Sequence, residues 1–362
     1  MYPYYIIFSL SLAFFAISQT LVRNGRVGSR FFLLTSIILL ICLAAYRGQW
    51  VGTDTSTYLS FWDKFQNVDF QFENWLFSEP LFVLLQNITR YIADETFLGQ
   101  EVFLGAISTL VCCLTFAAIK QNSVNKTLSF FVFLFLGFYT FHFNGARQAI
   151  AIALFLYSIK YILNGNAKKY ALIVFVGFLF HKTMLITIPF YFLFRRDFTP
   201  KVVLLIVLFT FAATYSITSV VEYASEYDER YRGYANSDFD GGGVVSVMFY
   251  TVILLWLYLV GKLNRINSKL YNISLLSMFI SVSIGWLSVG LSLNPSGVLR
   301  LAYYFTQFMI FALPMSILSF HSKSTRNVLL SLFILCSLCY FYFTTTSFSG
   351  LAPYSSSLPP LL

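Results

Sequence analysis

Residues 170–194, YALIVFVGFLFHKTMLITIPFYFLF, are apolar and long enough to cross a membrane once, yet His181, Lys182 and Thr183 lie at their centre. A membrane-spanning helix needs about 20 mostly apolar residues, and ionisable groups at its middle are costly. How the chain treats this segment decides how often it crosses a membrane and which of its loops share a side.

The composition indicates an integral membrane protein. Of the 362 residues, 58% are hydrophobic and 11% are charged, and the mean hydropathy is +0.72. Soluble domains carry about 25% charged residues. We interpret the first apolar run, MYPYYIIFSLSLAFFAISQTL, as a span and not as a signal peptide, because no basic residues precede it and no small-residue cleavage site follows it.

Ten stretches, the first of them this run, have the length and composition of membrane spans. They cover residues 3–22, 30–46, 98–119, 127–143, 147–163, 201–221, 244–261, 271–291, 301–320 and 327–345. The apolar stretch 80–92 is too short to cross and carries Arg90. We therefore predict an all-α polytopic membrane protein with about ten full transmembrane helices.

The basic residues settle which side each loop faces, because cytoplasmic loops are rich in Lys and Arg. If the N-terminus lies outside and neither 80–92 nor 170–194 makes a net crossing, 16 of the 24 basic residues fall on the cytoplasmic side. Of the 15 acidic residues, only Asp197 does. A single crossing by either stretch would move Lys-rich loops outward. Both termini are thus expected outside, and the net charge of +9 reflects topology and not a nucleic-acid partner.

This parity predicts that residues 170–194 enter from the cytoplasmic side and return to it, as a re-entrant or short helical hairpin. His181, Lys182 and Thr183 would form its tip. Irregular backbone survives at membrane depth only when it is buried in protein or lines a watery cavity. We expect one transmembrane domain, 1–362, with outer loops near 47–97 and 222–243, the second being a candidate lid or plain solvated coil.

Polar groups from four separate segments are expected to gather near the outer surface. They are Arg47 and Asp54, His142 and Arg147, His181 and Lys182, and Arg300. Arginines near span ends can also reach the lipid headgroups, which is the alternative for Arg47 and Arg300. Arg147 has no acid near it in the sequence to neutralise it. A buried structural role is the alternative for His181.

These residue types suit a pyrophosphate substrate. The planar guanidinium matches phosphate oxygens in bidentate fashion, and a nearby His or Asp could take a proton from an attacking hydroxyl. We expect no metal, since no HExxH or CxxC-type pair occurs outside an apolar span, and no other cofactor. Neither a GxxxxGK[ST] loop nor a GxSxG elbow is present, which disfavours an ATP-driven pump.

Four stretches, in this order, resemble the EpsG family, which is related to the Wzy-type O-antigen and exopolysaccharide polymerases. They are YRGQWVGTDTSTY (46–58), FNGARQAIAIALFLYSIKYI (143–162), FHKTMLITIPFY (180–191) and RLAYYF (300–305). The likeness extends over about residues 20–320. It implies a glycosyltransferase of GT-C-like architecture in the bacterial inner membrane. Such an enzyme joins undecaprenyl-pyrophosphate-linked repeat units on the periplasmic face, en bloc and without a metal.

The resemblance also suggests roles for individual residues. Arg147 and Arg300 would hold the donor pyrophosphate with help from Arg47, and His181 would be the general base, which Asp54 orients or replaces. Supporting or sugar-binding positions are Tyr58, Gln148, Lys182, Tyr303 and Tyr304. Gly48 and Gly52 would let the backbone turn so that Arg47 and Asp54 face a cleft. A chain-length regulator and a flippase of the same pathway are the expected protein partners.

Three other functions remain open at this point. An O-antigen ligase uses a similar lipid donor, but usually has a large periplasmic domain between late spans. A flippase or transporter of the lipid-linked oligosaccharide would place polar groups nearer the midplane and often contains repeats. A scaffold of an export complex could use the arginines only to bind anionic headgroups.

Overall fold

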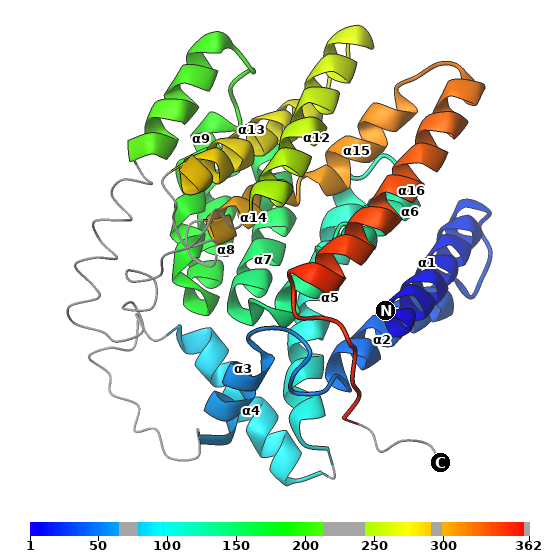
Figure 1. Ribbon diagram of the computed structural model, residues 1–362, viewed down its shortest axis with the longest axis vertical. Helices are drawn as coiled ribbons and strands as arrows, with labels where there is room; N and C mark the ends of the chain where they lie inside the picture. The colour runs from blue at the N-terminus through cyan, green and yellow to red at the C-terminus, as the bar shows by residue number, and fades with distance from the viewer. Residues whose placement is uncertain (65–78, 97, 213–242, 291–298, 358–362) are drawn as a thin grey trace. The chain divides into compact units, whose positions relative to one another are not determined.

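The computed structural model describes residues 1–64, 79–96, 98–212, 243–290 and 299–357. The chain is 79% helical, and the described residues contain no β-strand; a single isolated bridge pairs Arg47 with Ser356. The all-helical prediction is therefore confirmed (Figure 1). The predicted outer loop 222–243 lies, except for Gly243, outside the described residues.

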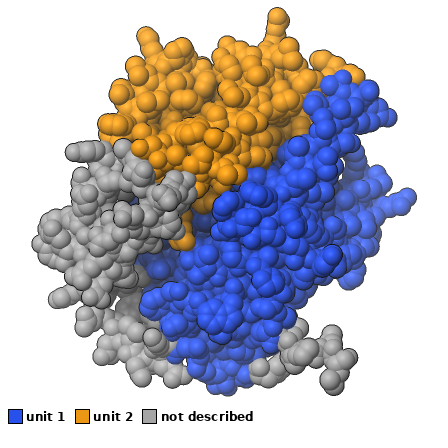
Figure 2. Space-filling view, viewed as in Figure 1, with its two compact units in different colours: residues 1–188, 323–362 blue, residues 189–322 orange. Residues whose placement is uncertain are grey.

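The chain divides into two compact units. Unit 1 comprises Met1–Ile188 and Lys323–Leu362, and unit 2 comprises Pro189–Ser322 (Figure 2). The single transmembrane domain expected from the sequence stays a prediction.

Eight helical segments of the described chain are long and apolar enough to cross a membrane, which makes this a multi-pass membrane protein. They are Tyr2–Arg23, Gln100–Asn122, Lys126–Phe143, Ala146–Leu163, Val244–Leu263, Lys269–Gly290, Arg300–Leu318 and Lys323–Ser347. All eight coincide with predicted spans. The other two predicted spans correspond to shorter helices, α2 (Ser29–Ala45) and Pro200–Ala212. Residues 213–221 of the second lie outside the described part.

In unit 1, successive helices pack side by side. α1 (Tyr2–Arg23) packs on α2, α2 on α5 (Gln100–Asn122), α5 on α7 (Ala146–Leu163), and α7 on α8 (Ala167–Phe180). Membrane helices approach where side chains are small or can hydrogen-bond across the interface. The hydroxyls of Ser11 and Ser36, 3.0 Å apart, join α1 to α2 in this way.

Aromatic side chains fill the interior between the first and last helices of unit 1. α16 (Lys323–Ser347) packs on α6 (Lys126–Phe135), and the Phe341 ring lies 6.1 Å from that of Phe135. Phe8 of α1 contacts both rings edge-on or tilted, at centroid distances of 5.5 and 5.4 Å. Many of the chain's Phe and Tyr side chains therefore pack in the protein core.

The segment at 170–194 is interrupted where the sequence predicts. α8 ends at Phe180, His181 is extended, and a 3₁₀-helix, η4 (Lys182–Thr187), follows. The Tyr170 hydroxyl donates a 2.7 Å hydrogen bond to the Thr187 carbonyl, 17 residues later. A continuous helix would separate these residues by about 25 Å, so the chain reverses direction at His181.

The described residues between α2 and α5 include two helices that are too short to cross a membrane. They are α3 (Thr55–Lys64) and α4 (Pro80–Asp94). α4 is amphipathic, with Phe82, Gln86 and Thr89 buried on one face. The structure thus agrees with the exclusion of 80–92 from the spans.

Unit 2 is a smaller helical bundle. α13 (Lys269–Gly290) packs on α12 (Val244–Leu263), α14 (Arg300–Thr306) and α15 (Met309–Leu318), while α9 (Phe190–Leu193) is a single turn. The Phe190 ring of α9 packs edge-on against Phe305 of α14, 4.6 Å away. This unit carries Arg300 and the tyrosines that follow it.

Candidate functional site

A buried carboxylate, Glu79, joins two of the predicted site residues. Its Oε2 accepts a hydrogen bond of 2.5 Å from Nη1 of Arg147, and its Oε1 accepts one of 2.6 Å from Nδ1 of His181. The backbone N–H of Lys182 donates a third, 3.3 Å bond to Oε1. Only 7% of the Glu79 side chain is exposed, against 37% for Arg147 and 23% for His181.

Three local features bring these side chains together. Glu79 immediately precedes α4, whose first residue, Pro80, suits a helix start. Arg147 lies in the first turn of α7. α8 then returns alongside α7 for 14 residues, so that the break at His181 falls beside the start of α7. The hairpin is thus as long as is needed to place His181 at Arg147.

The backbone of Glu79 is unusual. Its φ of 58° and ψ of 61° are left-handed, which few residues other than glycine adopt. Such conformations cost on the order of 1 kcal/mol and persist where surrounding contacts hold them. Here the three hydrogen bonds to the carboxylate hold it.

The electrostatics keep Glu79 ionised. Burial by itself would raise the pKa of this carboxyl, but the hydrogen bond and charge of His181, followed by those of Arg147, outweigh it and lower the pKa to about 2. An ionised carboxylate only accepts hydrogen bonds, so Nδ1 of His181 must carry the proton that it shares with Glu79. In neutral imidazole the other nitrogen, Nε2, is then a proton acceptor.

The surroundings leave His181 able to act as a base. Among the described residues, no group hydrogen-bonds to its Nε2. A carboxylate on Nδ1 fixes the tautomer and stabilises the imidazolium that forms when Nε2 takes a proton. Glu79 therefore occupies the orienting position that the sequence suggested for Asp54.

Arg147 is flanked by aromatic rings as well as by Glu79. The centroids of Tyr58 and Phe82 each lie 5.7 Å from its guanidinium carbon. Tyr58 is buried, as is Gln148, which follows Arg147 in the sequence, while Lys182 is exposed. The expectation that Arg147 lacks a neutralising acid is wrong, because Glu79, 68 residues earlier in the chain, supplies one.

Sequence reasoning missed Glu79. It stands in a polar outer segment together with other acids, and nothing in that segment distinguishes it from a solvated side chain. Two signals were present: it directly precedes Pro80 and an amphipathic apolar run, and Arg147 needed a counter-charge. Only the tertiary fold joins these two facts.

Arg47 has a different environment, since it is completely buried. Nη1 donates a 2.8 Å bond to the Ala44 carbonyl, Nε donates a 3.3 Å bond to the Thr55 hydroxyl, and the guanidinium lies 4.1 Å from the Phe143 ring centroid. Burial lowers its pKa to about 10, against the opposing effect of nearby tyrosines. Its surface is not available to a ligand in this structure.

The turn that follows Arg47 is also a packing feature. Gly52 has a φ of +95°, and a Cβ there would lie 2.7 Å from the Phe143 carbonyl oxygen, so glycine is required. The Thr53 hydroxyl donates a 3.0 Å bond to the Asp54 carboxylate, and the Asp54 carbonyl accepts the N–H of Tyr58 at the start of α3.

Residues 348–357, which we call the C-terminal strap, cover this turn. The N–H of Gly48 donates to the Ser355 carbonyl at 2.8 Å, and that of Gly52 donates to the Gly350 carbonyl at 2.9 Å. The side-chain amide of Asn144 donates to the Ser349 carbonyl at 2.8 Å. These bonds gather the ends of α2, α6 and α16 at one end of unit 1.

His142 also belongs to this packed region. It is fully buried, and its Nδ1 bonds the Tyr139 carbonyl at 2.5 Å. Its Nε2 has no partner among the described residues. Its contacts among the described residues do not include Glu79 or His181, so the predicted polar residues of unit 1 lie in two separate clusters.

The remaining predicted residues lie in unit 2. Arg300 is the first residue of α14 and is half-buried; Tyr303 is half-buried and Tyr304 is fully buried on the same helix. No group of three or more His, Cys, Asp or Glu side chains capable of holding a metal occurs in the described part of the chain.

These observations define a multi-pass helical membrane protein with an oriented histidine and an arginine on one buried carboxylate. The chain belongs to the EpsG family, whose family model matches residues 30–356, and this is a family of membrane proteins of the exopolysaccharide and O-antigen polymerase type. Searches of curated proteins and of solved structures each found no match. The GT-C-like architecture consequently stays a prediction.

Proposed function

We propose that this protein is a polysaccharide polymerase that joins oligosaccharide repeat units linked to undecaprenyl pyrophosphate. The reaction takes place at the periplasmic face of the bacterial inner membrane, with both termini of the chain on that side. The observation that carries the proposal is the double contact of Glu79, which holds His181 and Arg147 together. Family membership supports the substrate class.

In this reaction, a hydroxyl of the acceptor's non-reducing-end sugar attacks the anomeric carbon of the donor chain. Nε2 of His181 takes the hydroxyl proton as the new glycosidic bond forms. The bond from the anomeric carbon to the pyrophosphate oxygen breaks, and the lipid pyrophosphate leaves with the electron pair. Arg147 stabilises the charge that builds on the departing oxygens.

Glu79 is a positioning residue in this mechanism. It fixes the His181 tautomer and compensates the imidazolium charge, while it restrains the Arg147 guanidinium. Two carboxylate oxygens bonded to two different side chains set the spacing between base and phosphate site. Preorganised groups of this kind need no rearrangement at the transition state.

Other residues complete the proposal from the family resemblance. The resemblance assigns Arg300 to the donor pyrophosphate, and assigns to sugar contact or support of the site Tyr58, Gln148, Lys182, Tyr303 and Tyr304. Asp54, immediately before α3, is the alternative general base. We leave Arg47 out of the pyrophosphate site, because its guanidinium is completely buried. A chain-length regulator and a flippase would act on the same lipid-linked substrate.

The direct test is polymerisation by purified protein. The producing strain's lipid-linked repeat unit is incubated with the protein in the presence of EDTA, without nucleotide, and the products are separated by size. We expect a ladder from the wild type, and a rate lower by about 10²–10⁴-fold for His181→Ala, the usual contribution of a general base. His321→Ala, an exposed histidine in unit 2, is the matched control.

Other outcomes would assign the protein elsewhere. Transfer of a preformed chain to lipid A core, without a ladder, would indicate a ligase. Movement of the lipid-linked unit across proteoliposomes, with no change in its length, would indicate a transporter. A ladder that requires a divalent metal would contradict the role given to the arginines.

A further inference from the structure

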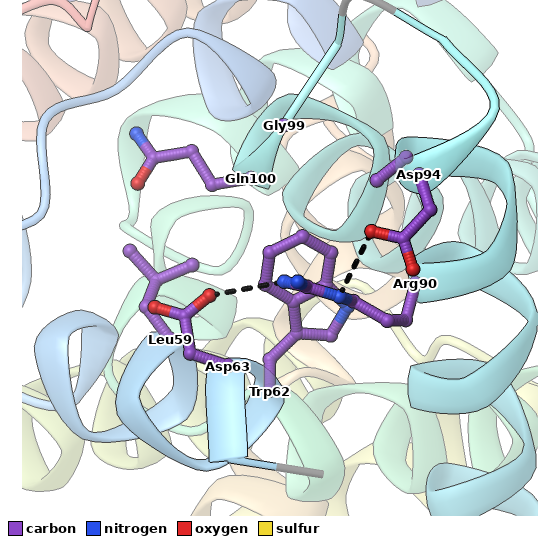
Figure 3. A pocket seen from close by; sticks show the side chains of 8 residues that line it. Leu59, Trp62, Asp63, Arg90, Asp94, Gly99 and Gln100 are labelled. Atoms are coloured by element: carbon purple, nitrogen blue, oxygen red, sulfur yellow. Dashed lines mark hydrogen bonds and ion pairs between the residues drawn. The ribbon is translucent and has the colours of Figure 1, made fainter. Parts of the chain in front are cut away.

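A polar cavity lies in the outer segment of unit 1, away from the Glu79 cluster. Its volume is about 380 Å³, within the range of small-molecule sites. α3, α4 and the start of α5 form it, and its lining includes Leu59, Trp62, Asp63, Arg90, Asp94 and Gln100 (Figure 3).

The centre of this cavity is a flat, fixed guanidinium. Arg90 lies over the Trp62 ring, 4.8 Å from its centroid, and the nearly parallel ring of Phe103 lies 6.0 Å from that of Trp62. The indole N–H donates a 3.2 Å bond to the Thr89 hydroxyl, which fixes the ring. The floor of the cavity is therefore rigid.

Two carboxylates hold Arg90 from either side, as Figure 3 shows. Asp63 accepts a 3.2 Å bond from Nη1, and Asp94 lies 3.3 Å from Nε. The Asp63 and Asp94 side chains are 67% and 53% exposed. Exposed ion pairs contribute only about 0–1 kcal/mol to stability, so stability alone does not explain three charged groups fixed around a concavity.

The charges select the class of ligand. Two carboxylates repel a phosphate or another anion, and Arg90 repels a metal ion or another cation. Carboxylates only accept hydrogen bonds, guanidinium only donates them, and the Gln100 amide does both. A neutral ligand with many hydroxyls, each both donor and acceptor, matches this lining, while Leu59 offers an apolar surface for C–H groups.

We propose that this cavity is a saccharide-binding subsite, in which the hydroxyls of a neutral sugar are held by Asp63, Asp94, Arg90 and Gln100. α3 and α4 connect it to the Glu79 cluster, since Tyr58 neighbours Leu59 and Glu79 precedes α4. Arg90 follows Glu79 by 11 residues, or about 16 Å of helix. The subsite thus holds a sugar remote from the reacting bond, and only the identity of that sugar rests on the proposed function.

The test measures binding without reaction. Oligosaccharides of one and two repeat units, released from the producing strain's polysaccharide and labelled at the reducing end, are equilibrated with detergent-purified protein by dialysis. We expect saturable binding, weakened at least tenfold in the double variant Asp63→Asn with Asp94→Asn. Glu95→Gln, an exposed acid next to Asp94 that does not line the cavity, should bind like the wild type.

A second comparison separates this inference from the polymerase proposal. His181→Ala should bind the free oligosaccharides as the wild type does, because the cavity lies elsewhere. If no ladder forms in the polymerisation assay but the double variant still loses binding, the subsite stands and the reaction assignment falls. Equal binding by the double variant and the wild type, or no saturable binding by either, would overturn the subsite.

Discussion

Arg47 follows the apolar helix α2, and Arg147 lies in the first turn of the apolar helix α7. The structure places these two arginines in opposite environments. Arg47 is completely buried against backbone carbonyl, hydroxyl and aromatic groups, and none of the described residues offers it a carboxylate. Arg147 is 37% exposed and bonded to Glu79, which also bonds His181. An arginine that is sealed in packing serves the fold, whereas one that is exposed beside an oriented base can serve chemistry.

The largest expected effect tests whether the C-terminal strap seals Arg47. Truncation after Ser347 removes the strap and its hydrogen bonds to Gly48, Gly52 and Asn144, each worth about 0.5–1.5 kcal/mol. It also uncovers Arg47. We expect a loss of about 1.5–4.5 kcal/mol in stability, measured by thermal unfolding in detergent.

Truncation after Ser357 is the matched control, because it keeps every one of these bonds. It should unfold at the wild-type temperature. If the protein truncated after Ser347 proved as stable as the wild type, the strap would not seal Arg47. Arg47 would then again be a candidate ligand-binding residue.

The next effect tests whether Glu79 orients His181 beside Arg147. Glu79→Gln keeps the side-chain shape but removes the charge that orients His181 and compensates its protonation. We expect kcat to fall by at least about tenfold, and by as much as about 10⁴-fold, the loss found when the carboxylate behind a general-base histidine becomes an amide, with KM for the lipid-linked substrate changed much less. Glu79→Asp should restore part of kcat.

A purely structural role for Glu79 would lower the amount of folded protein without changing kcat per folded molecule. Glu95→Gln, at the other end of α4, serves as the control and should retain full kcat. An unchanged kcat in folded Glu79→Gln would show that the Glu79 carboxylate does not assist His181 in the reaction.

Arg147→Lys gives a smaller effect that sharpens the contrast between the arginines. Lysine keeps the charge but lacks the planar fork for bidentate contact with phosphate. We expect about a tenfold loss of kcat/KM for the donor. The control is Arg26→Lys, which changes an exposed arginine in the turn between α1 and α2. Full activity of the lysine variant would exclude a bidentate role.

The spans and the hairpin could be predicted because their causes are local. Apolar runs of about 20 residues identify helices, and the distribution of Lys and Arg required residues 170–194 to turn back. His181 and Arg147 stood out as ionisable groups in apolar segments, where each needs a reason. Those parts of the fold and site were readable from the sequence.

The pairing of these residues was not readable, because it depends on contacts across long sequence separations. Glu79 looks like any other acid in the outer segment until α7 and α8 bring Arg147 and His181 to it. Arg47 looks exposed until the strap, about 300 residues later, covers its turn. The GTDT turn therefore serves the packing of the strap, and the Glu79 cluster supplies the candidate chemistry.

The smallest expected effect is the pH dependence of stability that Glu79 introduces. Its pKa is about 2 in the folded protein and takes its ordinary value near 4.5 in the unfolded chain. A carboxyl with a lowered pKa stabilises the folded state above the unfolded value, and this stabilisation disappears as the pH falls towards the folded value. Because its partners are partly exposed, we expect about 1–2 kcal/mol. The unfolding temperatures of wild type and Glu79→Gln should therefore differ by a constant amount just above pH 4.5 and converge as the pH falls towards 2. A difference that does not shrink over this range would show that the Glu79 charge does not stabilise the cluster.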